Sequence, residues 1–390
     1  MSYLVQPVRP RLGLCGGANG KTTILEASVQ TLDWFAQQLI AWQRQHGRHN
    51  LPWQQQINPY RVWVSEIMLQ QTQVATVIDY YLRFMQRFPT LGQLADAPID
   101  DVLHHWTGLG YYARARNLHR AANIIKDDHA GKMPSTQEQL ESLPGIGRST
   151  AGAIRALAMN QYASILDGNV KRVLTRFHGI HGYPGETEIT KQLWRIAEEH
   201  TPEEQTAAYT QGIMDLGATL CVRRQPNCPA CPMQSRCEAK RTDTTAELPS
   251  PKPKKTKPVR TSRFFVVSLP NQATLLEQRA MDGLWGGLWT PPERHSDTSI
   301  ETFLAELSLT PADLNEQLHE QVFRHTFSHF HLDIEPIYLR LKNAPMQIAE
   351  NSARWVLPTQ INAENEPLGL SAVAVKLLTA QTNPQKALDL

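Results

Sequence analysis

The chain has 390 residues, of which 41% are apolar and 19% charged, and no apolar stretch reaches the roughly 18 residues that a membrane-spanning helix needs. This composition excludes collagen-like, coiled-coil and membrane-spanning proteins, and the length predicts two or three domains at about 150 residues each. The 39 basic and 37 acidic residues give a formal charge of +2, so net charge alone does not point to a nucleic-acid partner.

The first 30 residues carry a glycine-rich stretch that ends in Gly20-Lys21-Thr22. A phosphate-binding loop needs a glycine five positions before Gly20, where this chain has Cys15, and no β-rich run precedes the stretch. We therefore predict residues 1–30 to be a flexible leader, or one translated from a wrongly assigned start, without a nucleotide site.

From Phe35 to about Cys237, apolar residues recur at three- and four-residue spacing, with Gly or Pro breaks between segments. The alternating β-branched pattern of sheets is scarce in this region. The pattern predicts an all-α domain over residues 31–238, with helical stretches at 60–88, 99–106, 113–125 and 190–197.

Residues 239–262 change character, because lysines alternate with prolines and large apolar residues almost vanish. Such a stretch cannot bury a core and is typical of an extended linker. After it, short strand-like runs at 264–269, 273–276 and 331–341 surround a helical run at 300–307. These elements predict a separate α+β domain over residues 263–390.

A glycine turn, Leu143-Pro144-Gly145-Ile146-Gly147, precedes a helical run at 151–158. Glycines at 145 and 147 permit a tight turn that points backbone N–H groups outward at a helix N-terminus, where they can hold a phosphate. An ordinary helix–helix turn would use the same residues.

Four of the five cysteines crowd into one segment with the spacing C-x6-C-x2-C-x5-C. Four thiolates can surround zinc or an iron–sulfur cluster. Zinc sites usually use two close pairs, whereas only Cys228 and Cys231 form one here. Together with Cys221 and Cys237 they form a segment that resembles, in its cysteine spacing, the loop by which endonuclease III-like DNA glycosylases hold a [4Fe-4S] cluster. Few cysteines and no secretory signal pattern favour the cytoplasm.

Four further sequence motifs narrow the resemblance to one glycosylase family. They are Leu51-Pro52-Trp53 and residues 65–73 (SEIMLQQTQ), 106–112 (WTGLGYY) and 166–171 (LDGNVK). From about 35 to about 378 the chain resembles the MutY family of adenine DNA glycosylases. The resemblance implies a helix-hairpin-helix glycosylase domain with a [4Fe-4S] loop, joined by the linker to a Nudix-like domain. It also implies a monomer without membrane contact, acting at the nucleoid of a prokaryote on double-stranded DNA that carries adenine opposite 8-oxoguanine or guanine.

Two carboxylates, Glu66 and Asp167, lie within these motifs. Taken alone, Asp167 is typical of a helix N-cap, and Glu66 of a paired carboxylate among apolar neighbours. Breaking the N-glycosidic bond of adenine needs a proton for the purine and negative charge near the cationic sugar, and a protonated Glu and an ionised Asp suit these roles. The resemblance implies that Glu66 protonates N7 and that Asp167 stabilises the oxocarbenium ion or a transient covalent sugar.

Position 149 separates two kinds of enzyme on this scaffold. Bifunctional relatives carry a lysine there, whose amine forms a Schiff base with the sugar, whereas this chain has Ser149. Strand cleavage by that route is not expected. Lys171 lies nearby in sequence and could trap an aldehyde without being required.

The resemblance also implies how DNA is contacted. Gln71 and Tyr111 would enter the base stack as wedges, while Trp53 and Gln211 would contact the extruded adenine. The basic residues that follow Tyr111 would face phosphates, or would form a solvated helix face: Arg114, Arg116, His119 and Arg120.

The C-terminal domain keeps little of a Nudix metal box. Gly287 and Glu293 fit its opening, but most carboxylates of its core are absent from residues 301–306, so nucleotide hydrolysis is not expected. Phe327-Ser328-His329 matches the loop by which the family recognises 8-oxoguanine. A metal site on His325, His329 and His331 is the alternative.

Two other functions remain open from the sequence. One is a glycosylase/lyase for thymine or pyrimidine lesions, against which Ser149 and the Phe-Ser-His loop argue. The other is a cluster-containing damage sensor that binds DNA without cutting, against which Glu66 and Asp167 argue.

Overall fold

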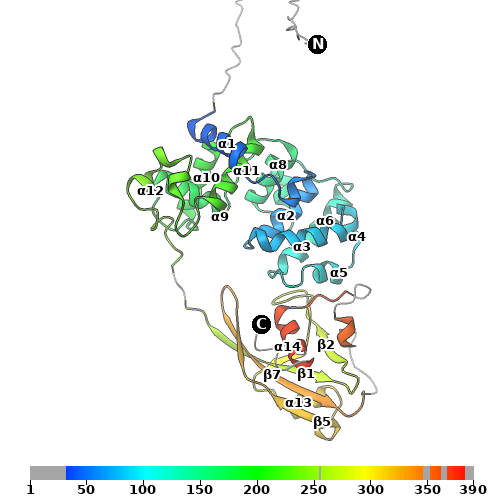
Figure 1. The fold of residues 1–390 in the computed structure, drawn as a ribbon. Coiled ribbons are helices and arrows are strands. Elements are labelled where there is room, and N and C mark those ends of the chain that lie inside the picture. The colour runs from blue at the N-terminus through cyan, green and yellow to red at the C-terminus, as the bar shows by residue number, and fades with distance from the viewer. Residues whose placement is uncertain (1–31, 254–255, 346–351, 362–366, 383–390) are drawn as a thin grey trace, which may run out of the picture. The chain divides into compact units, whose positions relative to one another are not determined.

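The computed structural model describes residues 32–253, 256–345, 352–361 and 367–382 (Figure 1). The predicted leader over residues 1–30, with Cys15, lies outside the described residues. The chain separates into the units Met1–Leu32 and Asp33–Leu390, and all helices and strands given below belong to the second.

α-Helices make up the first half of this unit, as the sequence predicts. They are α1 (Trp34–His46), α2 (Pro59–Leu69), α3 (Val74–Arg87), α4 (Leu91–Asp96), α5 (Ile99–His105), α6 (Ala113–Asp128), α7 (Gln137–Glu141), α8 (Arg148–Met159), α9 (Gly168–His178), α10 (Thr187–His200), α11 (Thr206–Thr219) and α12 (Glu238–Arg241).

The sequence predicts one helical stretch over residues 60–88, whereas the structure has two helices there. The chain leaves helical geometry after Leu69, and Gln71 adopts a left-handed backbone with a φ of 57°. A second helix begins at Val74, so the segment from Gln70 to Gln73 becomes a connection between α2 and α3. This break places Gln71 on the surface.

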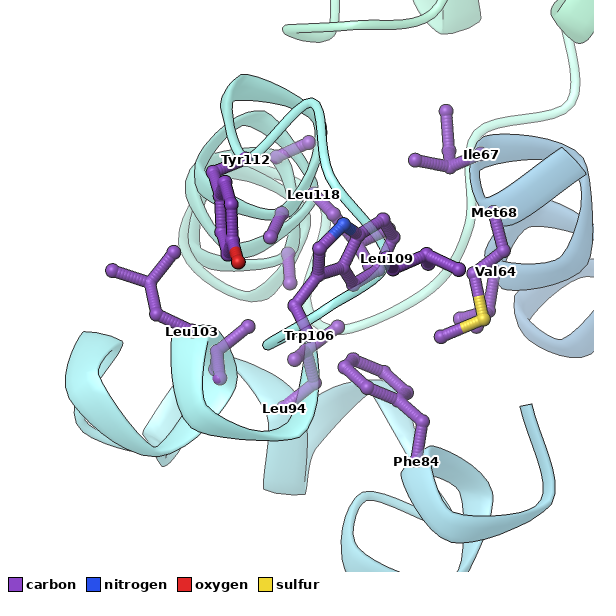
Figure 2. Packing of buried hydrophobic residues seen from close by; sticks show 14 of the residues in the cluster. Val64, Ile67, Met68, Phe84, Leu94, Leu103, Trp106, Leu109, Tyr112 and Leu118 are labelled. Carbon is purple, nitrogen blue, oxygen red and sulfur yellow. The ribbon is translucent and has the colours of Figure 1, made fainter. Parts of the chain in front are cut away.

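The helices pack around a core centred on Trp106, which is fully buried. Figure 2 shows Phe84 below its indole and Leu109 beside it, with Met68 and Val64 of α2 beyond Leu109. The rings of Trp106 and Phe84 meet edge to face at 5.9 Å between centroids. The indole N–H donates to the carbonyl of Gly110 at 3.1 Å, so the ring also fixes the loop that follows α5.

A mixed sheet with two flanking helices follows. Its elements are β1 (Val259–Ser268), β2 (Thr274–Gln278), β3 (Trp289–Thr290), β4 (Glu293–His295), α13 (Ile300–Glu306), β5 (Leu314–His319), β6 (Phe323–Thr326), β7 (His331–Leu341), β8 (Ala353–Val356) and α14 (Ala372–Thr382). The main path of the sheet runs β3-β2-β1-β7-β5, in which β1 and β7 are parallel. The α+β class of this region is confirmed.

Strand β1 begins at Val259, inside the stretch that the sequence predicts to be linker up to residue 262. The reason is pairing across the sheet, since Val259 to Ser262 lie opposite His331 to Ile334 of β7. Further along the strand, Phe265 stacks on Phe303 of α13 with ring centroids 3.9 Å apart, which anchors that helix on the sheet. Among the described helices, none combines the length and apolar character needed to cross a bilayer.

Candidate active site

A cavity of about 730 Å³ opens among α2, α8, α9 and α11 of the helical region. Its volume lies in the range of about 300–1,000 Å³ that is usual for ligand sites. Of the residues that the sequence singles out, it is lined by Trp53, Glu66, Gln71, Ser149, Asp167 and Gln211. Tyr111, Gly145, Gly147 and Lys171 lie outside its lining.

Glu66 reaches the cavity from α2, between the buried side chains of Ser65 and Ile67. In the described part of the chain its carboxyl group accepts no hydrogen bond. Burial, and after it the negative charge of Asp167, raise the pKa of Glu66 to about 8. Glu66 therefore holds a proton at neutral pH and can donate it.

Asp167 is the N-cap of α9 as well as a wall of the same cavity. Its Oδ1 accepts the backbone N–H of Val170 at 2.7 Å, and its Oδ2 accepts the side-chain amide of Asn169 at 3.2 Å. Burial raises the pKa of Asp167, while these hydrogen bonds act against burial and favour the charged form. Since Glu66 has no such donors, the pair is arranged to hold its negative charge on Asp167 and its proton on Glu66.

Ser149 stands at the start of α8 and supports the segment that leads into Asp167. Its hydroxyl oxygen accepts the backbone N–H of Leu166 at 3.0 Å. An alcohol in this position cannot form an imine with a sugar aldehyde.

Lys171 lies outside the cavity, in a neighbouring groove. Its ammonium group donates to the carbonyl of Pro184 at 2.9 Å, and burial lowers the pKa of Lys171. The groove has a volume of about 620 Å³, and its cationic lining residues are Lys171, Arg172, Arg223, Arg224 and Lys252. This concentration of positive charge beside the cavity suits a DNA backbone.

Gln71 and Tyr111 both occupy strained turns at the surface. Each is a non-glycine residue with a positive φ, of 57° and 50° respectively, and the Tyr111 side chain is 51% exposed. This backbone conformation costs free energy in a non-glycine residue, and it is often found at functional sites. The geometry suits two side chains that project from the protein.

Arg114 ties the turns of Gln71 and Tyr111 together from beneath. Its guanidinium donates to the carbonyls of Gln70 at 2.6 Å and Gly110 at 3.1 Å, and to the hydroxyl of Thr72 at 3.2 Å. The side chain is buried, and burial lowers its pKa to about 10. The prediction that Arg114 lies on a phosphate-facing or solvated surface is therefore wrong, because backbone carbonyls distant in sequence draw it inward.

The glycine turn connects α7 to α8. Gly145 has a φ of 81°, and a Cβ there would lie 3.0 Å from the Cβ of Asn117, so a larger residue would be strained. Gly147 is extended and forms the N-cap of α8, where a Cβ would meet nothing within 4 Å. Two helices joined by this short glycine turn have the arrangement expected of a helix–hairpin–helix.

The four clustered cysteines are free thiols that surround a cavity of about 30 Å³. Buried Arg176 donates to the sulfur of Cys221 at 3.4 Å and to the carbonyl of Val222 at 2.7 Å. Burial raises the pKa of Cys231 to about 12. Across the described residues, no three His, Cys, Asp or Glu side chains gather closely enough for a single metal ion. Four thiols line one space with a guanidinium beside it, and such a set of donors suits an iron–sulfur cluster.

The loop between β6 and β7 presents two polar side chains on an aromatic base. Phe327 stacks on Phe330 with centroids 4.6 Å apart, and the ammonium of Lys257 donates to the Phe327 carbonyl at 2.7 Å. Ser328 and His329 are exposed, and the serine hydroxyl lies 3.2 Å from the imidazole Nδ1. The stacked Phe327 and Phe330 rings hold the loop in place, and the side chains of Ser328 and His329 are left accessible to a ligand.

Two carboxylates at Nudix-box positions, Glu293 and Glu306, are paired with arginines. Glu293 pairs with Arg279, and Arg294 bridges Glu277 at 2.9 Å and Glu306 at 2.7 Å. Carboxylates held in this way are poor ligands for a divalent cation, so the arrangement agrees with the absence of a complete box in the sequence.

Among the residues that sequence reasoning missed are Arg48 and Asn169, which line the cavity, and Asp215, which lies behind it. Asn169 lies in the LDGNVK motif, two positions after Asp167, and this closeness is a signal that it could contact the carboxylate. Asp215 interrupts an apolar helical run, which is itself a signal of a special role. Arg48 offers no signal beyond its closeness to Trp53 in the chain.

Comparison with known proteins gives matches to both parts of the chain. Residues 64–199 match the family described as "HhH-GPD superfamily base excision DNA repair protein", and residues 263–380 match the NUDIX domain. Adenine DNA glycosylase of Buchnera aphidicola subsp. Acyrthosiphon pisum is 40% identical over 79% of this chain and 87% of its own length. The same enzyme of Buchnera aphidicola subsp. Baizongia pistaciae is 37% identical over 88% of this chain and 96% of its own.

Among solved structures, a thermostable thymine-DNA glycosylase is 26% identical to this chain. It covers 53% of this chain with 95% of its own, at a TM-score of 0.49.

Proposed function

The chain belongs to the adenine DNA glycosylases, and from that premise we propose that it removes adenine lying opposite 8-oxoguanine or guanine and leaves an abasic site. As a member of this family it is a base-excision repair enzyme that hydrolyses an N-glycosidic bond. The observation that carries the proposal is the Glu66 and Asp167 pair, which lines one cavity and in which only Asp167 accepts hydrogen bonds from described residues that favour its charged form.

In the proposed reaction Glu66 gives its proton to N7 of the extruded adenine. The C1′–N9 bond then breaks with its electrons on the base, which leaves as neutral adenine. The Asp167 carboxylate stabilises the positive charge that develops on the sugar. Water adds to C1′ and its proton returns to the carboxylate of Glu66.

Other residues of this chain prepare the substrate. We infer that Gln71 and Tyr111 enter the stack from their strained turns, and that Trp53 and Gln211 hold the extruded base in the cavity. The glycine turn at Gly145 and Gly147 would hold a phosphate of the bent duplex.

We also propose that Cys221, Cys228, Cys231 and Cys237 hold one [4Fe-4S] cluster, supported by their spacing and by Arg176 beside them. Such a cluster supplies a rigid, redox-capable centre to the loop that carries its ligands. The proposed domains are the glycosylase at 31–238, a linker over 239–262 that contains the end of α12 and the start of β1, and the lesion-reading domain at 263–390. The enzyme would act as a monomer on DNA in the cytoplasm.

The proposed function is tested by single-turnover excision on three duplexes, which carry adenine opposite 8-oxoguanine, adenine opposite guanine, or thymine glycol. We expect release of adenine from the first two and no reaction on the third. Because Ser149 cannot form an imine, the product strand should stay intact until it is treated with alkali or heat. Direct nicking in step with adenine release, or reaction on thymine glycol, would contradict the proposal.

The cluster proposal predicts a brown protein with a broad absorbance near 400 nm, roughly as iron–sulfur proteins show, and about four irons per chain. Cys228→Ser should lower iron content and stability of the purified protein. Cys15→Ser is the matched control and should leave the iron content unchanged. Colourless, active protein that contains zinc would be the contrary result.

The Phe327-Ser328-His329 loop is proposed to read the lesion. 8-Oxoguanine differs from guanine by an N7–H donor and an O8 acceptor, which exposed Ser328 and His329 can meet. A good pair of hydrogen bonds to a base is worth about 1–3 kcal/mol, roughly 5- to 150-fold. Ser328→Ala combined with His329→Ala should therefore reduce the preference for 8-oxoguanine over guanine by this factor, while adenine opposite guanine is still removed.

The control is His319→Ala, which removes an exposed histidine on β5 of the same domain. It should leave the preference unchanged. Equal weakening on both duplexes by the Ser328 and His329 substitutions would show that the loop adds only general affinity.

A further inference from the structure

Asp215 is a fully buried carboxylate on α11 that the proposed reaction does not use. Arg48 holds it through three contacts: the guanidinium Nη2 and Nε meet Oδ1 at 2.7 and 2.8 Å, and the backbone N–H donates to Oδ2 at 2.8 Å. Burying an ion pair is expensive and seldom adds stability compared with apolar packing. This pair therefore invites a functional explanation.

The explanation lies one helical turn earlier, at Gln211. Its side-chain amide nitrogen donates to Oδ1 of Asp215 at 2.9 Å. Gln211 lines the catalytic cavity, whereas Asp215 lies behind it. A carboxylate that is paired with a guanidinium can only accept hydrogen bonds, so it dictates which end of the glutamine amide faces it. The amide oxygen of Gln211 is then the end that can accept a hydrogen bond from a ligand in the cavity.

We propose that Asp215, anchored by Arg48, is a positioning residue that fixes the Gln211 amide so that its oxygen faces position 6 of the extruded purine. This inference rests on the proposed function, in which Gln211 contacts the base. Adenine carries an amine donor at position 6, which a fixed acceptor binds. Guanine and hypoxanthine carry an oxygen there, which the same acceptor repels. Selection of 6-aminopurines over 6-oxopurines is thereby built into α11.

The test compares excision of adenine and of hypoxanthine, each placed opposite 8-oxoguanine, under single-turnover conditions. Hypoxanthine keeps N7 for Glu66 and changes the group at position 6. In Asp215→Asn the new amide can donate as well as accept, so Gln211 can turn and present its NH2 to the oxygen. The ratio of the adenine rate to the hypoxanthine rate should fall by roughly 5- to 150-fold, the factor that corresponds to about 1–3 kcal/mol for one wrongly paired polar group.

Gln211→Met tests the same orientation without disturbing the ion pair. If the oxygen faces the base, its removal takes away both the attraction for the amine and the repulsion of the 6-oxygen, and the ratio falls. If the NH2 faced the base instead, the same substitution would raise the ratio and overturn the inference. The double variant should show no further fall beyond Gln211→Met, because Asp215 acts through Gln211.

Asp101→Asn provides the matched control. Asp101 is another buried aspartate paired with an arginine, Arg87, and lies on α5 outside the cavity lining. It should cost stability and leave the ratio unchanged. An unchanged ratio in Asp215→Asn with equally lowered rates would reduce Asp215 to a structural role and overturn the inference. Failure of the unaltered enzyme to release adenine opposite 8-oxoguanine would instead overturn the proposed function.

Discussion

Glu66→Gln is expected to lower the single-turnover rate of adenine release by roughly 10²–10⁴-fold, the range for loss of a positioned general acid. The amide keeps the shape of the carboxyl group but has no proton to transfer to N7. Binding to a duplex with adenine opposite 8-oxoguanine should change little, since Glu66 makes no hydrogen bond to any residue that the structure describes. A gel-shift or anisotropy titration on the same duplex separates the two effects.

The unaltered enzyme should carry the signature of the same proton. Because the acid must be protonated to act and its pKa lies at about 8, the rate should be level near neutral pH and fall as the pH rises through 8. Glu188→Gln, on an exposed carboxylate of α10, is the control and should keep both the rate and the profile. Loss of DNA binding in parallel with loss of excision by Glu66→Gln would count against the assignment.

The elements best predicted from the sequence are those whose side-chain period continues without interruption. Strand β7 has the predicted bounds, His331–Leu341, because alternate residues are buried along most of its length. The helices at 113–125 and 190–197 are likewise found, each a few residues longer than predicted. Their ends depend on caps and neighbouring packing, which periodicity does not report.

The break at Gln71 could not be predicted, because glutamine gives no turn signal comparable to glycine or proline. Apolar spacing resumes in α3 after the polar residues 70–73, and periodicity does not report that Gln71 takes a left-handed backbone. The prediction for Arg114 was wrong for a related reason. A basic residue near other basic residues indicates a charged surface, whereas Arg114 donates to the carbonyls of Met68 and Gln70, which are 46 and 44 positions away in the chain.

For the candidate site, the sequence supplies residue types and the structure supplies their surroundings. Glu66 and Asp167 stand out in the motifs shared with the family. The sequence does not show that, among the described residues, Asp167 has two hydrogen-bond donors and Glu66 has none. That difference decides which of them keeps the proton. The Arg48, Asp215 and Gln211 arrangement was hidden for the same reason, since Arg48 and Asp215 are 167 positions apart.

Asp167→Asn separates the two roles that Asp167 fills. Asparagine caps helices about as well as aspartate, so the start of α9 and the stability of the protein should be nearly unchanged. The negative charge near the sugar is lost, and the rate of adenine release should fall by roughly 10²–10³-fold, as when one preorganised electrostatic group is removed.

The same substitution should alter the remaining carboxyl group. The charge of Asp167 helps to raise the pKa of Glu66, so Glu66 should titrate at lower pH in Asp167→Asn. The residual activity should therefore begin to fall below pH 8, measured by single-turnover rates across pH beside thermal unfolding of both proteins. Near-normal turnover with an unshifted profile would leave Asp167 as a helix cap alone. A reduced rate with a profile displaced to lower pH, on a protein of unchanged stability, requires that the two carboxyl groups act on one substrate as a coupled pair.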